Sequence, residues 1–407
     1  MIPSLLLGLA ASASLAQPLT DSEAERAHWT IHAEKVYAAP GELLENATVN
    51  VEDGKITRLG SGGRGDLEVY AITAGLVDAS VRIDEGRRSV EESSEIQSAL
   101  SVAETLDPFS HLWQRQLRSG VTTAMVSPPD RNVVGGLSVV LKTGGPASIA
   151  ARTVAADVAL CGAIGSSPSR GNHAVWGRPT DFFSRRPTTR MGVEWEWRRA
   201  FYDAALGRRN GQAPDADARG LLEVLDGKRP LFVQAWATQD IRTAAFFVEE
   251  MAREGFGQIR LVVDAAAEAW KEPAFLVRTG AGVVLPPFPH SGRGGPDQAF
   301  TAWNSATILH GAGIPLALSS HGAEAPADRL ERQAGYAMRG GLPFDAALAA
   351  VTLTPARMLG VDERVGSIAV GKDADLVLWN GEPFETTSRV IGVLLEGRLV
   401  VDPRAEN

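Results

Sequence analysis

The residues best suited to chemistry in this 407-residue chain are two histidines and an aspartate, each placed at or just beyond the end of a predicted strand. Asp264 ends the apolar segment 259–264, His290 follows the segment 282–285, and His321 follows the segment 315–319. Imidazole and carboxylate groups at the ends of neighbouring strands could bind a divalent metal or transfer protons. The alternative, which we favour, is that the two loop histidines line a pocket without chemistry.

The spacing of the other reactive side chains argues against a conventional site. None of the seven histidines forms a His-x-His or His-x-x-x-His pair, so no strand or helix presents two imidazoles together. The single cysteine, Cys161, excludes an intrachain disulfide and any cysteine-based metal cluster. No neighbouring feature lowers its pKa, so we interpret it as a buried thiol rather than a nucleophile. No Gly-x-Ser-x-Gly motif surrounds a plausible serine nucleophile.

The middle of the chain alternates between strand and helix patterns, and these elements must position the candidate residues. Strands are predicted at 120–127, 137–142, 231–236, 259–264, 282–285 and 315–319. Helices are predicted at 108–118, 238–255, 268–278 and 297–310. The alternation predicts a parallel sheet with helical crossovers, and residues 73–365 would form a (β/α)8 barrel. Residues 165–215 are the least regular part, and we predict a loop excursion over the barrel mouth.

Both ends of the chain have β patterns. Residues 48–59 alternate apolar and polar around Asp53-Gly54, a dipeptide that favours a two-residue hairpin turn, and a strand is predicted at 33–37. Near the other end, 376–379 and the hairpin 390–401 are predicted strands. Because a few short strands cannot bury a core alone, the strands within residues 17–72 need partners, and residues 366–407 can supply them.

Several of these segments resemble the amidohydrolase superfamily. Residues 75–81 resemble its first barrel strand, and residues 366–379 resemble its C-terminal segment. The segments 117–123, 187–193 and 353–360 are similar to elements of its exported, imidazolonepropionase-like subgroup. The resemblance implies a barrel joined to one small β-sandwich, which residues 17–72 and 366–407 would form together. It also implies zinc or another divalent metal at the mouth, which would activate a water against a C–N bond.

The positions that hold metal ligands in that family have changed in this chain. The resemblance places Ser80, Arg82, Trp236, Ala265 and His321 at these positions, and Cys161 at a mid-barrel lysine. Only His321 is an ordinary metal ligand, while Arg82 puts a permanent positive charge where a dication would lie. We therefore predict that the family's metal site is degenerate and that no metal or other cofactor is bound.

Composition and the first residues bear on partners and location. The chain is 44% hydrophobic with a net charge of −9, so nothing favours nucleic acid as a partner. Residues 1–16 form an apolar stretch that ends in Ser-Leu-Ala and resembles a secretory signal peptide. No cysteine follows it, so we expect no lipid or other membrane anchor. These features predict a periplasmic or secreted bacterial protein.

Three functions follow as hypotheses. The favoured one is an exported, catalytically degenerate amidohydrolase homologue that binds a small molecule or a protein partner, for which an active paralogue is one candidate. The second is a hydrolase of carbon–nitrogen bonds, including cyclic amides, whose altered site combines Arg82, Asp264, His290 and His321. The third is a sugar- or peptide-binding module built on the tryptophan-rich segment 176–197, which requires tryptophans that face the mouth.

Overall fold

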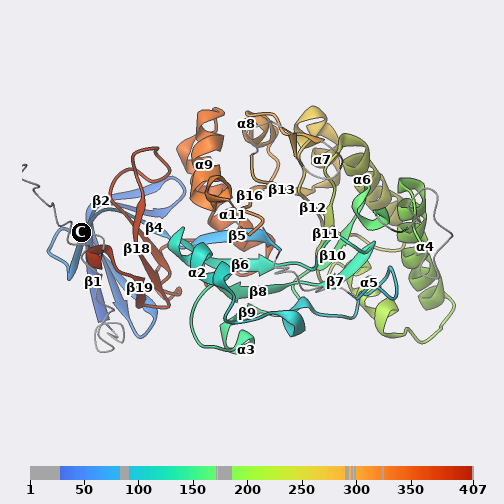
Figure 1. Cartoon of the computed structure of the whole chain (residues 1–407), viewed down its shortest axis with the longest axis horizontal. Helices are drawn as coiled ribbons and strands as arrows, with labels where there is room; N and C mark the ends of the chain where they lie inside the picture. The colour runs from blue at the N-terminus through green and yellow to red at the C-terminus, as the bar shows by residue number, and fades with distance from the viewer. Residues whose placement is uncertain are drawn as a thin grey trace, which may run out of the picture.

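The computed structural model describes residues 28–82, 91–170, 172, 186–288, 293–294, 297, 299–322 and 325–405. They form a mixed α/β fold with a separate sheet at one end of an elongated molecule (Figure 1). The predicted signal peptide, His290 and Trp176 lie outside the described residues. No helix in the described ranges is long and apolar enough to cross a membrane.

The separate sheet contains strands from both ends of the chain. Its order is β19-β18-β17-β4-β1-β2-β3, and β17 pairs antiparallel with β4. The strands are β1 (His28–Ala39), β2 (Glu42–Glu52), β3 (Lys55–Ser61), β4 (Leu67–Ala74), β17 (Leu376–Trp379), β18 (Val390–Leu395) and β19 (Arg398–Val401). Asp53 and Gly54 form the predicted turn, with φ of 47° and 79°. The two chain ends share one sheet, as the sequence predicts, while its folding into a two-layered sandwich stays a prediction.

The remaining long strands form two further sheets. The four-stranded sheet contains β5 (Leu76–Val81), β6 (Val121–Val126), β8 (Val139–Lys142) and β9 (Thr153–Ala155). The six-stranded sheet contains β7 (Val134–Leu137), β10 (Leu160–Ala163), β11 (Leu231–Gln234), β12 (Leu261–Asp264), β13 (Gly282–Leu285) and β16 (Leu316–Leu318). From β10 to β16 neighbours run parallel, as expected for strands joined by helices. Among the described strands, no backbone ladder pairs a strand of one of these sheets with a strand of the other, so closure into a (β/α)8 barrel stays a prediction.

Ten α-helices are described, and most of them connect or cover these strands (Figure 1). They are α2 (His111–Arg118), α3 (Ile149–Arg152), α4 (Arg190–Arg209), α5 (Ala216–Leu225), α6 (Thr238–Arg253), α7 (Pro273–Thr279), α8 (Ser305–Gly311), α9 (Leu330–Arg339), α10 (Phe344–Ala350) and α11 (Leu353–Met358). A two-stranded ribbon joins β14 (Arg293–Gly294) to β15 (Ala299–Phe300).

Two helix predictions were wrong in their extent. The predicted helix 268–278 is a short 3-10 turn followed by α7, because Pro273 disfavours helical geometry at Glu272, which has φ −141° and ψ 62°. The predicted helix 297–310 begins only at Ser305, and β15 occupies part of the segment before it. In both cases a local backbone feature interrupts a periodic apolar pattern.

The prediction that 165–215 is irregular was wrong for residues 190–209, which form the 20-residue helix α4. The side chain of Thr189 caps its first turn by accepting a hydrogen bond from the Gly192 amide. Its buried face contains Val193, Trp197 and Phe201, which recur every four residues. The Ser-, Pro- and Arg-rich composition had hidden this spacing.

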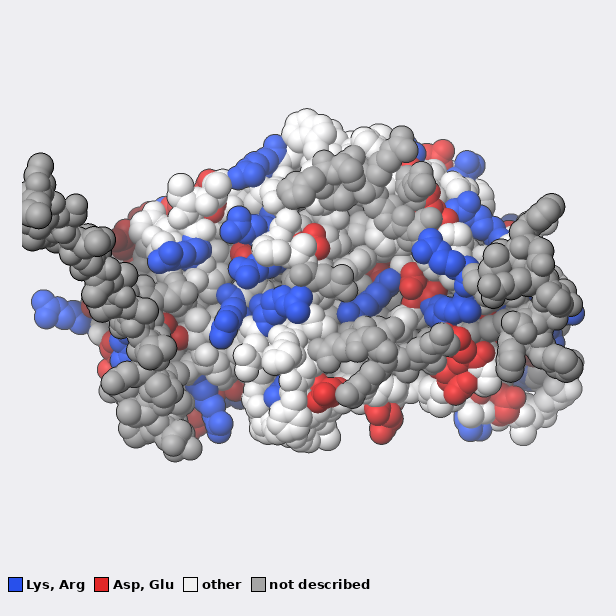
Figure 2. All heavy atoms as spheres, in the orientation of Figure 1, with Lys and Arg blue, Asp and Glu red and all other residues white. Residues whose placement is uncertain are grey.

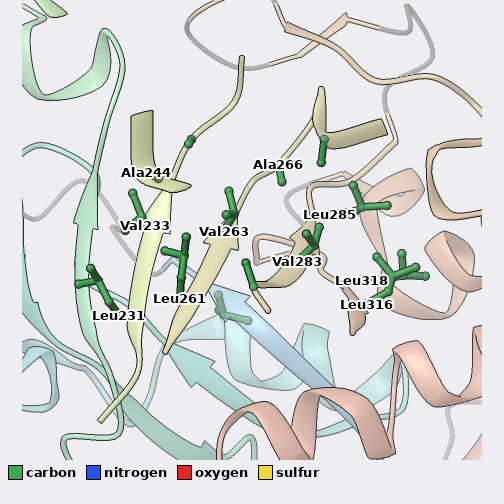
Figure 3. Close-up of a cluster of buried hydrophobic side chains, with 14 of the residues drawn as sticks. Leu231, Val233, Ala244, Leu261, Val263, Ala266, Val283, Leu285, Leu316 and Leu318 are labelled. Atoms are coloured by element: carbon green, nitrogen blue, oxygen red, sulfur yellow. The ribbon is translucent and has the colours of Figure 1, made fainter. Parts of the chain in front are cut away.

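The strands of the six-stranded sheet are buried on both faces, which explains their nearly continuous apolar sequences. Alternate side chains enter two different clusters. Leu231 and Val233 share one cluster with Ala244 of α6 (Figure 3), whereas Phe232 packs in another that contains Cys161. Because neighbouring strands from β10 to β16 run parallel, their C-terminal ends lie at the same edge of the sheet.

Two contacts fix the seven-stranded sheet to the rest of the molecule. Gly75 connects β4 to β5, and a Cβ there would lie 2.0 Å from Oγ1 of Thr122, so only glycine fits. Nζ of Lys142 lies 2.8 Å from Asp373 and 2.6 Å from Asp375, and all three side chains are buried. Asp373 and Asp375 thus hold the two regions together through a buried cation.

Candidate functional site

The candidate site is centred on Asp264, which ends β12 and is 4% exposed. Its Oδ2 accepts hydrogen bonds from Oγ of Ser80 (2.8 Å) and Nη2 of Arg82 (2.9 Å), and its Oδ1 accepts one from the Ala265 amide (2.8 Å). Nε2 of His321 lies 3.8 Å from Oδ1. Burial would raise the pKa of this carboxyl, but His321, Arg82 and Ser80 outweigh burial and hold it well below its usual value.

Arg82 bridges Asp264 to a second carboxylate, Asp130, whose Oδ2 lies 3.4 Å from Nη1. Burial disfavours the charged guanidinium, but Asp130 and Asp264 offset this and raise its pKa. In turn, Arg82 and a hydrogen bond from Gln234 overcome burial and lower the pKa of Asp130. The cavity beside these groups, which Cys161 also lines, is only about 10 Å³ and has room for about one water molecule.

His321 occupies a strained position in the loop after β16, with φ of 47°. Its amide donates to Oγ of Ser319 at 3.0 Å. The imidazole lies edge-on to Trp236, with ring centroids 5.9 Å apart and an interplanar angle of 84°. Within the described ranges, neither Nε2 of His321 nor Nε1 of Trp236 has a hydrogen-bond partner, although both are buried.

Asp78 links the tip of β5 to the loop after β16. It is fully buried in β5; Oδ1 accepts from the Ser80 amide (3.1 Å), and Oδ2 accepts from the amide and Oγ of Ser320 (2.9 and 2.5 Å). Gln116 of α2 also donates to Oγ of Ser320. Burial raises the pKa of Asp78, although these hydrogen bonds oppose the shift. Asp78 thereby ties the tip of β5 to the loop that carries His321.

The structure brings together most of the residues proposed from the sequence. Arg82, Asp264 and His321 converge, with Ser80 and Trp236 in contact with members of this group. His290, the fourth residue of the altered-site hypothesis, is outside the described part of the chain. Sequence reasoning missed Asp130; its signal was a Pro-Pro-Asp sequence that directly follows the strand 120–127.

Cys161 and Ala265 play different parts from metal ligands in this arrangement. Cys161 is 6% exposed on β10, and burial raises the pKa of its thiol to about 12. Ala265, with φ of 53°, contributes only its backbone amide to Asp264. Neither residue supplies an anionic donor at neutral pH.

The donor set does not fit the divalent metal that the superfamily typically uses. Both carboxylates nearest to Arg82 are already paired with it. Trp236 presents an N–H donor and Ala265 a methyl group, and neither coordinates a cation. Across the ranges with assigned structure, no three His, Cys, Asp or Glu side chains gather in an arrangement that could hold a metal ion. We therefore derive no reaction step through a metal.

A second charged cluster lies at the N-terminal end of α4 and was also missed from the sequence. Arg190 at the start of α4 contacts Oδ2 of Asp240 (3.2 Å) and Oδ1 of Asp297 (2.7 Å). Burial raises the pKa of Asp240 to about 6; Arg190 opposes this shift, while Asp297 adds to it. A Cβ on Gly165 would lie 2.8 Å from Asp297 and 3.0 Å from Asp240, so glycine leaves room for the carboxylates above β10.

Comparisons with known proteins agree with this fold. A model described as "Amidohydrolase family" matches residues 306–400. Amidohydrolase tasK of Hapsidospora irregularis is 25% identical over 375 residues, which cover 83% of this chain but only 37% of that protein. The crystal structure of an amidohydrolase from Thermotoga maritima MSB8 is 26% identical, with a TM-score of 0.78 over 92% of this chain and 99% of that chain.

More distant structures share the fold alone. A putative prolidase from Bifidobacterium longum is 16% identical, with a TM-score of 0.52 over 92% of this chain and 95% of that chain. The fold and these similarities define a mixed α/β protein of the amidohydrolase type. The family model, the curated relative and the Thermotoga maritima structure together support a place for this chain in the amidohydrolase superfamily.

Proposed function

We propose that this chain is a superfamily member without metal-dependent hydrolase activity, and that it acts by binding a small molecule or a protein partner. The observation that supports this most directly is the bridge from Arg82 to Asp130 and Asp264. A fixed guanidinium repels a divalent cation, and it engages the carboxylates that would otherwise attract one.

Acid–base and nucleophilic chemistry are also disfavoured at this position. Because the pKa of Asp264 is held well below its usual value, the carboxylate is a poor proton acceptor at neutral pH. With a pKa of about 12, the thiol of Cys161 stays protonated and is a poor nucleophile. The 10 Å³ cavity leaves no room for a substrate beside Asp264, so a ligand would contact the surrounding loops.

Elemental analysis of the purified protein tests this proposal, after dialysis against trace zinc, manganese and iron. We expect less than about 0.1 metal per chain, and no turnover of dipeptides or cyclic amides at enzyme-like rates. An Arg82→His variant should not gain metal, because Trp236 and Ala265 still lack donors. A metal content close to one per chain, with matching hydrolysis, would overturn the proposal.

A hydrolase of carbon–nitrogen bonds with an altered site is the second candidate. It is favoured by His321, whose buried Nε2 lies 3.8 Å from Asp264 without a hydrogen-bond partner among the described residues. Such a nitrogen could accept a proton from a nucleophilic water. This candidate requires hydrolysis of cyclic amides that His321→Gln abolishes; activity that survives this change would point to a contaminating enzyme.

A sugar- or peptide-binding module is the least supported alternative. Trp197 is 1% exposed in the core and donates from Nε1 to the Ala163 carbonyl, so it does not face a ligand. Trp195 is exposed on α4, but one exposed ring is not a stacking platform. Titration with oligosaccharides while following tryptophan fluorescence would revive this alternative if a saturable change were seen.

Export and partnership complete the proposal. We propose that residues 1–16 direct the chain to the periplasm or the medium, as their apolar pattern suggests. The intact mass of the protein from the periplasmic fraction should then correspond to a chain that begins at Gln17.

An active paralogue, as a candidate partner, should co-purify with this chain from native cells. A monodisperse, unaccompanied chain would argue against this partner.

A further inference from the structure

A groove of about 670 Å³ lies between α9 and strands of the seven-stranded sheet. It shares no lining residue with the cavity beside Asp264. Its volume is within the range of pockets that hold small molecules. The groove is bounded by both parts of the fold, since α2 and α9 supply one wall and the segment from β17 to β19 supplies the other.

The lining of this groove is rich in arginine although the chain as a whole is acidic. Its five arginines are Arg118, Arg329, Arg332, Arg339 and Arg389. Figure 2 shows Lys and Arg side chains gathered on the face around α9 and α2. In the described ranges, no carboxylate lies within ion-pair distance of Arg118, Arg329 or Arg332. Three neighbouring guanidinium groups without carboxylate partners create a local positive potential that attracts anions.

Acidic side chains in the groove neutralise little of this charge. Asp402 is held by Nη2 of Arg404, at 2.7 Å. Burial raises the pKa of Glu331 to about 7 in spite of Arg329 and Arg332 nearby, so part of the population is uncharged at neutral pH. Glu385 is exposed at the edge. The groove therefore keeps an excess of positive charge.

Buried polar atoms at the groove lack partners. They are Nε of Arg329, Oε2 of Glu331 and Oγ of Ser388, and each is without a hydrogen bond among the described residues. Buried polar groups are normally satisfied, because an unsatisfied one destabilises the protein. A ligand with several oxygens could accept hydrogen bonds from Nε of Arg329 and Oγ of Ser388. The protonated form of Glu331 could donate a third hydrogen bond.

We propose that this groove binds a small molecule with two or more carboxylate or phosphate groups. Arg332 and Arg389 are exposed at its edge, while Arg329 lies deeper. Planar guanidinium groups bind both kinds of anion through paired hydrogen bonds. Trp379 and Phe384, which pack edge to face at 5.4 Å, add an apolar wall. This site is separate from the one in the proposed function and does not depend on it.

Isothermal titration calorimetry on the full mature chain tests the proposal. The probes are citrate and inorganic pyrophosphate, with acetate as a monovalent comparison at constant ionic strength. We expect one citrate or pyrophosphate per chain and no measurable acetate binding. Binding of citrate alone would identify a carboxylate ligand, and binding of pyrophosphate alone would identify a phosphorylated one. Failure of both to bind at millimolar concentration would overturn the proposal.

Two variants locate the binding site. The double variant Arg332→Gln/Arg389→Gln should weaken binding at least about tenfold, because each change removes a charged hydrogen-bond donor. Arg253→Gln is the matched control, since Arg253 is also exposed but lies in the last turn of α6, outside the groove. Equal affinity in the double variant and the wild type would place the anion elsewhere and overturn the proposal. The single variant Arg332→Gln, with an expected smaller loss, serves if the double variant unfolds.

Discussion

Nη2 of Arg82 lies 2.9 Å from Oδ2 of Asp264, at the end of β12. This contact places a permanent cation where superfamily members hold a divalent metal, as inferred from the sequence resemblance. The same guanidinium reaches Asp130, so one cation is shared by two carboxylates. The guanidinium of Arg82 thus supplies the positive charge that balances these two carboxylates.

Removal of Arg82 should destabilise the protein. Arg82→Ala leaves the buried carboxylate of Asp264 without its cation, and the free energy of unfolding should fall by about 3 kcal/mol. Urea denaturation followed by circular dichroism measures this. Asp203→Ala breaks a solvent-exposed ion pair with Arg199 and should cost less than about 1 kcal/mol. Equal, small effects of both changes would contradict a structural charge bridge.

Lys142 and Lys55 contact the same carboxylate but should differ in importance. Lys142 is 3% exposed and holds both Asp373 and Asp375, whereas Lys55 is 48% exposed and contacts Asp373 alone. Lys142→Ala should lower the free energy of unfolding by about 3–5 kcal/mol, and Lys55→Ala by about 1 kcal/mol or less. Thermal unfolding of the two variants side by side gives the comparison; a larger loss for Lys55→Ala would refute it.

Asp373 should make stability depend on pH under acidic conditions. Burial would raise its pKa, but Lys142, Lys55 and Arg364 lower the pKa from 3.8 to about 2. A carboxyl with a lowered pKa stabilises the fold above its unfolded pKa, and this contribution is lost as pH falls from about 4 to about 2. Wild type and Asp373→Asn should differ by on the order of 2 kcal/mol at pH 6 and converge near pH 2. Urea titrations at each pH measure the difference, and a constant gap would disprove this origin.

The thiol of Cys161 should be inert in the native protein. Its pKa of about 12 and its 6% exposure both suppress the reactive thiolate. With a disulfide reagent at pH 8, we expect labelling at least about 100-fold slower than in guanidinium chloride, where the thiol is exposed. Rapid labelling without denaturant would show that the cavity beside Arg82 opens readily.

Local patterns predicted most of the strands. The turn at Asp53-Gly54 follows from the positive φ that these two residues tolerate, and the buried strands follow from their apolar runs. Helix boundaries were less predictable, since Pro273 divides one predicted helix and a composition rich in arginine concealed α4. Strand positions were thus more predictable from the local sequence than helix positions.

The candidate site was only partly predictable. The resemblance to the amidohydrolases directed attention to Ser80, Arg82 and His321, because the surrounding strand motifs are local in sequence. It gave no sign that Asp130 would share Arg82 with Asp264. Nor did it predict that Asp78 would bind Ser320 and so join two loops from distant parts of the chain.

The sequence by itself indicated the resemblance to the amidohydrolases, the order of most strands and, through that resemblance, a change of residue type at the expected ligand positions. Tertiary structure alone decided that Arg82 and Asp264, 182 residues apart, form a hydrogen-bonded ion pair. It also decided that Lys142 is buried against two aspartates from the end of the chain. The reason is physical: secondary structure depends on neighbouring residues, whereas the pairing of buried charges depends on which strand ends the completed fold brings together.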